Sequence, residues 1–549
     1  MPLKPVLKKN PLSALTCQPL SAGQVRMNDK TLKALYTQVA DCHELPMFEG
    51  VFRLSALLEK DAAQSASAKA IRTMMATQCE DGSFPLTVRE TLSLLRAVWA
   101  LYEYETQKEV LSCLLRWMNW ASKRWEEIIA DDTVCADPAD LLELLENVYR
   151  VTGISSLLKL CAVLSESTMN WSSVLTTASF QTPVSHLTTE DELAEGLKKE
   201  NGDLEGYYTR LALTNHGIGL ADGARASMLR GWLSGSAKEM NAAKSGWERL
   251  SRHHGAICGG VTAAPLLAGT NPSLPISSEV LGAWAEAFVS TCMGVHADWA
   301  WEALERMLAN AMPACVQENQ LLSVQRVNSF ADMTCNNKLL PRFCRGYALA
   351  MQSAVTAWED GCAVNLLMNG KYAVCGNKIV LSIEENADSY KITLRMKSEQ
   401  NAVLRIRIPS WAASSNLLLN GEHISTDKLV DSYAVLTRVW HDGDEITVKL
   451  GKKLTRCTSY HQGTYLLYGA QVMALPVVGD WRYAMCGNGI ADGDVIKAPL
   501  TPIAWKQDDD APHSLPVLPP LTGETRECVL VPYAEAHKRI ALFPQGDHA

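Results

Sequence analysis

The sequence predicts a multidomain α + β chain in which a helical toroid of the (α/α)6 type is followed by β-sandwich, jelly-roll-like domains. Three observations predict it. Apolar residues recur at helical spacing between about residues 30 and 358. After Gly361 the texture changes to short β-branched runs separated by turn residues. The 549 residues are 47% hydrophobic and 20% charged, which is typical of a globular chain with enough apolar material for a large core.

The expected helices come in pairs joined by short Gly, Pro and Asn turns. Six inner and six outer helices are what an (α/α)6 toroid needs, although a helical superhelix has the same periodicity and stays open as an alternative. The expected ranges are 31–60 with 64–78, 92–104 with 109–125, 140–151 with 155–167, 217–233 with 235–253, 279–293 with 297–312, and a last helix at 342–358.

The second half alternates apolar and polar residues, as half-buried strands do. Turn signals such as Asn420-Gly421 stand where hairpins need them. We therefore divide the chain into an N-terminal extension at 1–30, the helical domain at 31–360 and the β-sandwich region at 361–549. The expected strands cover 378–384, 390–396, 403–408, 417–419, 433–436 and 445–450, with closing strands at 527–532 and 538–543 after a Pro- and Asp-rich loop at 498–521.

Charge and cysteine usage narrow the classes of function. The chain has 51 basic and 60 acidic residues, a formal charge of −9, so we expect no nucleic-acid partner, because phosphate binding needs a basic surface. We also expect no membrane span and no secretory signal. The 16 cysteines lie singly, without CxxC pairs, which favours reduced thiols in the cytoplasm.

Several short motifs in the sandwich region resemble glycoside hydrolase family 127 (GH127), whose founding activity is β-L-arabinofuranosidase. They are Arg407-Ile408-Pro409-Ser410-Trp411-Ala412, Leu419-Asn420-Gly421, Arg438-Val439-Trp440, Gly443-Asp444-Glu445-Ile446, Leu466-Leu467-Tyr468-Gly469 and Leu530-Val531-Pro532-Tyr533. In the helical half the resemblance continues with Gln78, Asp81-Gly82, Asp140, Asn215-His216-Gly217, His254-Gly255, Gly269-Thr270-Asn271-Pro272, Glu305-Arg306 and Asn310-Ala311.

The resemblance implies an (α/α)6 barrel with β-sandwich domains and a retaining glycosidase whose nucleophile is a cysteine thiolate held on zinc. This chain departs from the family pattern. Where the family has a Glu-x-Cys, the nearest register has Val280-Leu281-Gly282, and a shift of one residue offers Glu279 without the cysteine. The family's Cys-Cys pair is Phe343-Cys344 here. We therefore expect no cofactor, with zinc as the alternative: Cys335 and Cys344 could rebuild a metal site with His254 and Cys258 only at an unusual spacing.

The candidate catalytic residues are Glu279 and Glu286, which lie seven apart on one helical face and could project into one cleft as a carboxylate pair. The residues expected to bind the sugar are Asn215, His216, His254, Asp140 and Arg89. Ion pairing or helix capping explains Asp140 and Arg89 equally well, and a histidine that caps a helix is the alternative for His216 and His254.

We expect a glycoside hydrolase-like protein that acts on an L-arabinofuranoside or a related sugar in the toroid cleft. Its expected partner is a carbohydrate ligand, and a homodimer stays open. The alternative is an inactive homologue that binds a glycan or a protein in the same cleft. A hydrolase or lyase for unsaturated glycans on the same toroid has only the fold in its favour.

Overall fold

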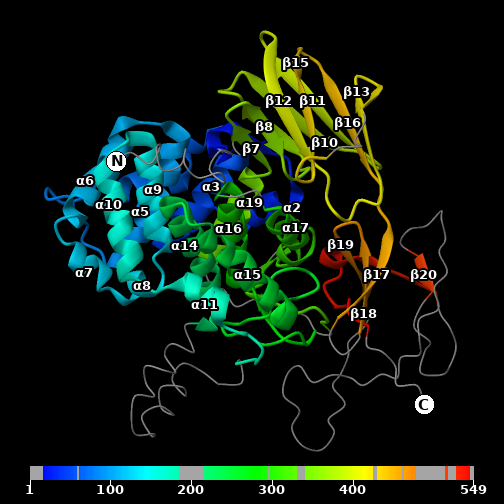
Figure 1. Ribbon diagram of the computed structural model, residues 1–549, viewed down its shortest axis with the longest axis horizontal. Helices are drawn as coiled ribbons and strands as arrows, with labels where there is room; N and C mark the ends of the chain where they lie inside the picture. Colours follow the sequence, from blue (N-terminus) through cyan, green and yellow to red (C-terminus); the bar gives the residue numbers. More distant parts are fainter. Residues whose placement is uncertain are drawn as a thin grey trace, which may run out of the picture.

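The computed structural model describes residues 17–58, 61–184, 214–294, 297–318, 320–329, 340–424, 429–459, 463–477, 514–516 and 527–543. Its first half is helical and its second half is built from sheets (Figure 1), which confirms the fold class. Among these described residues no helix is long and apolar enough to cross a membrane. Cys335 and most of the predicted loop at 498–521 lie outside the described residues.

Six inner helices form a ring in which each packs against the next and the last packs back against the first. Outer helices separate them along the chain, so the inner helices run in the same direction and begin at the same end of the ring. The inner helices are α3 (Phe48–Leu58), α5 (Val88–Glu105), α9 (Ala139–Thr152), α14 (Gly217–Ser234), α16 (Ser278–Gly294) and α19 (Pro341–Gln352). The outer helices are α2 (Lys30–Val39), α4 (Ala66–Met75), α6 (Lys108–Ala121), α10 (Ser155–Ser167), α15 (Ala237–His254) and α17 (Asp298–Arg306).

Local signals fix where these helices begin and end. Thr87 and Glu90 form a capping box at the start of α5, and the His216 ring accepts the Gly219 amide proton at the start of α14. Gly153 and Gly235 end α9 and α14 in the left-handed conformation that favours glycine. Shorter helices complete this half: α7 (Trp125–Ile129), α8 (Asp132–Ala136), α11 (Trp171–Thr177) and α18 (Met312–Ala314), which follows a π-helical turn over Met307–Ala311.

Four expected helices need correction. The range 31–60 is two helices, because Pro46 starts a short 3-10 turn between α2 and α3. The range 342–358 ends as a helix at Gln352, and Val355–Trp358 is strand β7, since it pairs with β8 (Gly361–Val364). The range 297–312 is α17 followed by the π-helical turn, and 109–125 stops at Ala121.

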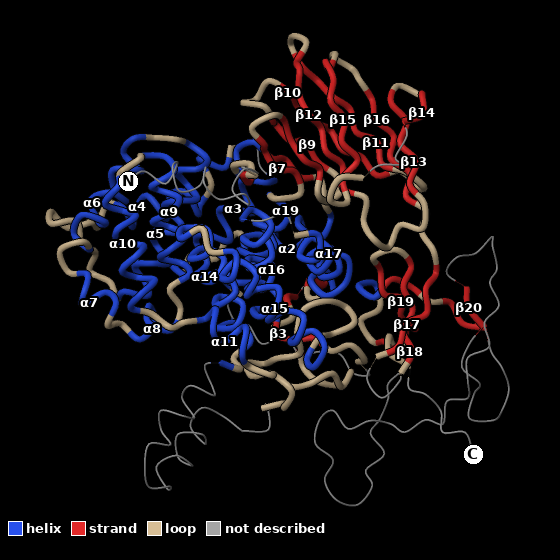
Figure 2. The backbone as a smooth tube through the Cα atoms, in the orientation of Figure 1, coloured by secondary structure: helices blue, strands red, loops and turns tan. Residues whose placement is uncertain are grey.

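Two open sheets form the sandwich beside the ring (Figures 1 and 2). One has the order β1-β7-β8-β12-β15, with β1 at Gln18–Pro19, β12 at Gln400–Arg407 and β15 at Tyr433–Trp440. The other has the order β14-β13-β16-β11-β10-β9-β2. Its strands are β14 (Glu422–Ile424), β13 (Ser415–Leu419), β16 (Glu445–Leu450), β11 (Tyr390–Met396), β10 (Ile379–Glu385), β9 (Gly370–Val374) and β2 (Val25–Met27).

The sandwich begins before the ring in the sequence. Strands β1 and β2 lie within the range that we call the N-terminal extension, and they pair with β7 and β9, more than 300 residues further along the chain. A third sheet holds β17 (Leu454–Thr458), β18 (Thr464–Tyr468), β19 (Gln471–Pro476), β22 (Val531–Pro532) and β23 (Arg539–Ile540). The short pairs are β20 (Ser514–Pro516) with β21 (Glu527–Val529), β3 (Ile276–Ser277) with β6 (Val324–Gln325), and β4 (Val316–Gln317) with β5 (Gln320–Leu321).

Motif residues hold the sandwich against the ring. Glu305, on outer helix α17, accepts hydrogen bonds from the Arg407 guanidinium at 2.7 Å and from the Trp411 indole at 3.1 Å. The Asn310 side chain joins the ring to the third sheet, because it donates to the Ala470 carbonyl and accepts the Val472 amide proton. The residues that carry the resemblance in this region therefore fix domain orientation.

Candidate functional site

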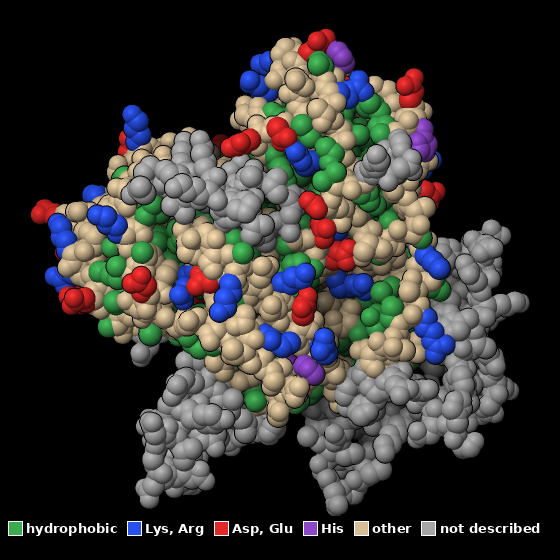
Figure 3. Space-filling view, in the orientation of Figure 1, with side chains coloured by type: hydrophobic (Ala, Val, Ile, Leu, Met, Phe, Trp, Pro, Cys, Tyr) green, Lys and Arg blue, Asp and Glu red, His purple; other side chains and the backbone are tan. Residues whose placement is uncertain are grey.

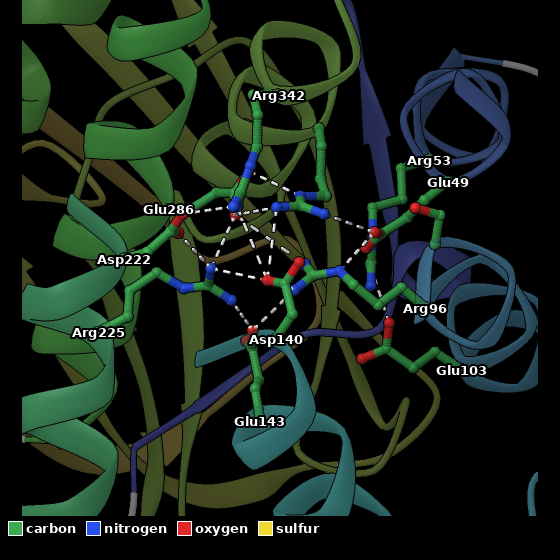
Figure 4. A network of polar contacts seen from close by, with 12 residues as sticks. Glu49, Arg53, Arg96, Glu103, Asp140, Glu143, Asp222, Arg225, Glu286 and Arg342 are labelled. Atoms are coloured by element: carbon green, nitrogen blue, oxygen red, sulfur yellow. Dashed lines mark hydrogen bonds and ion pairs between the residues drawn. The ribbon is translucent and has the colours of Figure 1, made fainter. Parts of the chain in front are cut away.

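A network of paired charged side chains lies inside the ring (Figure 4). We call this set the arginine–carboxylate network. On the described surface visible in Figure 3 acidic and basic side chains are interspersed, so the dense charge lies inside the ring and not on that face. The network contains five arginines, Arg53, Arg96, Arg225, Arg342 and Arg345, and seven carboxyl groups, Glu49, Glu103, Asp137, Asp140, Glu143, Asp222 and Glu286.

The innermost carboxylates each contact several arginines. Glu286 on α16 accepts from Arg345 Nε at 2.6 Å and Nη2 at 2.7 Å, and from Arg342 at 3.1 Å. Asp140, in the first turn of α9, hydrogen bonds with Arg96 and Arg225. Burial opposes the charge of Asp140, but the surrounding guanidinium groups outweigh it and hold its pKa well below the ordinary range.

The network leaves little room at its core. A cavity of about 20 Å³ lies among Glu49, Arg96, Asp140 and their neighbours, which is enough for about one water molecule and not for a sugar. A sugar therefore does not fit among these side chains. The N-terminal end is favoured for chemistry with carboxyl groups, because the free amides and dipoles of six helices converge there.

Glu279 lies at that end, in the first turn of α16, and is partly exposed. Its Oε2 accepts the Phe343 amide proton at 2.9 Å, in the first turn of α19. The residue before α19, Leu340, gives no side-chain cap, so Glu279 satisfies an amide that would otherwise lack a partner. Burial raises the pKa of Glu279 to about 7, although the Phe343 amide and Arg342 favour its charged form.

The two candidate catalytic residues thus differ. Glu286 is on the same helix as Glu279 but about 10 Å deeper, at 1.5 Å per residue. Its side chain is 1% exposed and bound by arginines, which leaves no open edge for a substrate. The catalytic pair of Glu279 with Glu286 stays a prediction, and of the two side chains only that of Glu279 is partly exposed.

The residues expected to bind the sugar differ in their exposure to solvent. His254 is fully buried: its Nε2 donates to the Phe180 carbonyl at 2.7 Å and its Nδ1 accepts the Gly269 amide proton at 2.9 Å. Burial lowers the pKa of this imidazole, which fits a neutral ring holding two loops together. Asn215 is buried, whereas His216 is partly exposed at the N-terminal end of α14. Arg89 is exposed on the first turn of α5, outside the network.

The described residues do not fit a zinc–thiolate centre. Burial raises the pKa of the Cys344 thiol, and among the described residues Cys344 belongs to no group of three possible metal ligands. The described residues offer one group of three metal-ligand side chains, Asp140, Asp222 and Glu286. All three are carboxylates already bound to arginines, which supply the positive charge that a cation would bring.

Sequence reasoning missed most of the network. A usable signal was present, since charged residues interrupt apolar runs of inner helices, as Arg96 does in Leu94-Leu95-Arg96-Ala97-Val98. Such residues are paired when buried, because an isolated buried charge is too costly. This signal predicts that buried, paired charges lie in the centre of the ring, but it does not identify which residues pair with which.

Comparisons with known proteins agree with this architecture. Residues 361–452 match the sequence profile of the β-L-arabinofuranosidase GH127 middle domain. A solved glycoside hydrolase superposes with a TM-score of 0.70 at 12% identity, over 98% of this chain and 99% of that one. A GH127 β-L-arabinofuranosidase from Geobacillus stearothermophilus T6 gives a TM-score of 0.65 at 14% identity over 94% of each chain, and a second GH127 β-arabinofuranosidase gives 0.65 at 12% over 97% and 98%. No curated protein sequence matches the chain.

Proposed function

We propose that this chain, a GH127 relative by its middle domain and its fold, hydrolyses an L-arabinofuranoside or a related glycoside at the N-terminal end of its helical ring. The comparisons support the fold and the identity of one domain. The carboxyl groups of the site support hydrolysis. Because the small central cavity admits about one water molecule, the sugar binds at the mouth, between the first turns of α9, α14, α16 and α19.

The observation that carries the proposal is the state of Glu279. A carboxyl group whose pKa is about 7 is half protonated at neutral pH, which suits a group that gives and takes a proton during glycoside cleavage. Glu279 is also partly exposed, unlike Glu286, so a glycosidic oxygen or a water molecule can reach it. Its contact with the Phe343 amide fixes the direction of its second oxygen.

The test is turnover of a panel of p-nitrophenyl glycosides that includes both anomers of L-arabinofuranoside, followed by Glu279→Gln. Glutamine keeps an oxygen that can accept the Phe343 amide proton but carries no titratable group. We expect the variant to lose activity by about 10²–10⁴-fold, the usual contribution of a general acid–base group. The matched control is Glu109→Gln, which removes the same charge from the first turn of outer helix α6.

One observation favours the alternative of an inactive glycan- or protein-binding homologue. The deeper carboxylates are neutralised by arginines and closed to solvent, so the ring centre offers few free catalytic groups. A folded wild-type protein that binds an arabinofuranoside but turns over none of the panel would favour this alternative.

A further inference from the structure

The arginines of the network are unevenly shared among its seven carboxyl groups. Most of the carboxyl groups have two or more arginine partners, and Asp140 and Glu286 each lie near four. Asp137 and Glu103 have one each among the described residues, Arg342 and Arg53 respectively. Five arginines balance five carboxylates, so these two are the surplus acids. Burial raises the pKa of both, which agrees with this count.

The two surplus acids lie at opposite ends of the ring. Glu103 is near the C-terminal end of α5, whereas Asp137 comes just before α9, at the N-terminal end where Glu279 lies. The Asp137 side chain is 24% exposed, so it borders the mouth of the ring. Its Oδ1 accepts the Ala139 amide proton at 3.3 Å, which holds the carboxyl group in place.

Asp137 also shares a guanidinium nitrogen with a second aspartate. Arg342 Nη2 lies 3.1 Å from Asp137 Oδ2 and also bonds Asp222 Oδ2. Asp222 is 1% exposed and has Arg225 as another partner, so it keeps the negative charge. Two carboxylates this close do not both ionise readily, and the proton therefore stays on Asp137, the member that faces the mouth.

Asp137 and Glu279 lie at the two ends of one side chain. Asp137 bonds the guanidinium of Arg342, and Glu279 bonds the backbone amide that directly follows Arg342. We propose that Asp137 is the second catalytic carboxyl group of this site, paired with Glu279 across the Arg342 side chain. The inference rests on the proposed glycoside hydrolysis. It assigns to Asp137 the role that Glu286, which is closed to solvent, does not fill.

The pair supports a single displacement by water. The Asp137 carboxyl proton passes to the glycosidic oxygen as the bond from that oxygen to the anomeric carbon breaks, and the oxygen keeps the bonding electrons. The oxygen of a water molecule forms the new bond to the anomeric carbon, and its proton passes to the Glu279 carboxylate. Asp137 ends ionised and Glu279 protonated, and one proton transfer through solvent restores them. A direct attack by water inverts the anomeric configuration, in contrast to the retention that the family resemblance implies, because this chain lacks the cysteine of the Glu-x-Cys motif.

The experiment compares Asp137→Asn, Glu279→Gln and Glu103→Gln on two glycosides of the same sugar, one with a 2,4-dinitrophenyl and one with a methyl leaving group. Dinitrophenolate leaves without protonation, so Asp137→Asn should lose at least 100-fold on the methyl glycoside and less than tenfold on the aryl one. Glu279→Gln should lose activity on both. Glu103→Gln, which removes the surplus acid at the far end, should keep wild-type rates.

Two further readouts separate the inference from the proposed function. Infrared difference spectra at pH 7 should show a protonated carboxyl band that Asp137→Asn removes, whatever the activity, and proton NMR of the first product should show inversion. Equal losses on the two glycosides, or a retained configuration, would overturn the role of Asp137 while leaving hydrolysis established. A wild-type protein that turns over neither glycoside would overturn both proposals.

Discussion

Arg345 binds both oxygens of Glu286, with Nε 2.6 Å from Oε1 and Nη2 2.7 Å from Oε2, and so joins α19 to α16 inside the ring. Two parallel bonds of this kind are among the strongest polar contacts in proteins. Here they lie beside an unusually close approach of the two helices. The sequence predicts Glu286 as a catalytic residue, but in the structure its carboxylate lies between guanidinium groups.

Replacing Glu286 should therefore affect stability. Glu286→Ala removes the nearest counter-charge of Arg345 and one of the counter-charges of Arg342 from a buried network, and we expect the free energy of unfolding to fall by about 3–5 kcal/mol. Urea unfolding followed by tryptophan fluorescence measures the change. Glu109→Ala, an exposed glutamate on α6, should change stability by less than about 0.5 kcal/mol. A near-neutral Glu286→Ala would mean that the network does not hold the ring together.

The raised pKa of Glu279 predicts a pH dependence of stability. Between the ordinary value of 4.5 and the folded value of about 7, the folded protein keeps a proton that the unfolded chain has lost. Stability is therefore full below pH 4.5 and falls as the pH rises to 7. Relative to Glu279→Gln, the wild type should lose ~2 kcal/mol over this window, allowing for the exposed part of the side chain. Unfolding of both proteins at pH 4.5 and 7.5 gives the difference, and parallel curves would contradict it.

The contact between α16 and α19 depends on two glycines. A Cβ at Gly282 would lie 2.2 Å from the Arg342 carbonyl oxygen, and one at Gly346 would lie 2.1 Å from the Gly282 carbonyl oxygen. Gly282→Ala should push the helices apart and cost ~3 kcal/mol or more. Thermal unfolding would show this as a large drop in Tm. In contrast, Gly23→Ala places its Cβ 3.5 Å from the nearest atoms and should be tolerated.

The bond between Glu305 and Arg407 should couple the ring to the sandwich. The Arg407 side chain is buried, and Glu305→Gln removes the charge that faces it. We expect a loss of about 2–3 kcal/mol and faster limited proteolysis between the two halves. Glu302→Gln is the neighbouring control, since Glu302 bonds the exposed Ser410. Equal proteolysis of the two variants would show that Glu305 does not fix the domains.

Much of the fold could be predicted because the relevant signals are local. Strands β11 and β16 begin and end where their alternating apolar residues predict, and the Asn420-Gly421 turn joins β13 to β14 with both residues in the left-handed region. Helices α9 and α14 end at glycines that the sequence displays. The prediction fails where a contact with another strand determines the secondary structure. The sequence of Val355–Trp358 predicts the end of a helix, but in the structure this segment is a strand because it pairs with β8.

The candidate site depended on contacts that a single sequence does not encode locally. The sequence by itself determined that a helical half precedes a β half, that Glu279 begins an inner helix, and that the zinc motif of the resembling family is interrupted. Only the tertiary structure decided which charges meet: it brought Asp137 and Glu279 to the two ends of Arg342 and closed Glu286 among guanidinium groups. The reason is physical. Helix and strand periods are set by neighbours a few residues apart, whereas the charge state and exposure of a carboxyl group here depend on side chains more than 200 residues away in the sequence.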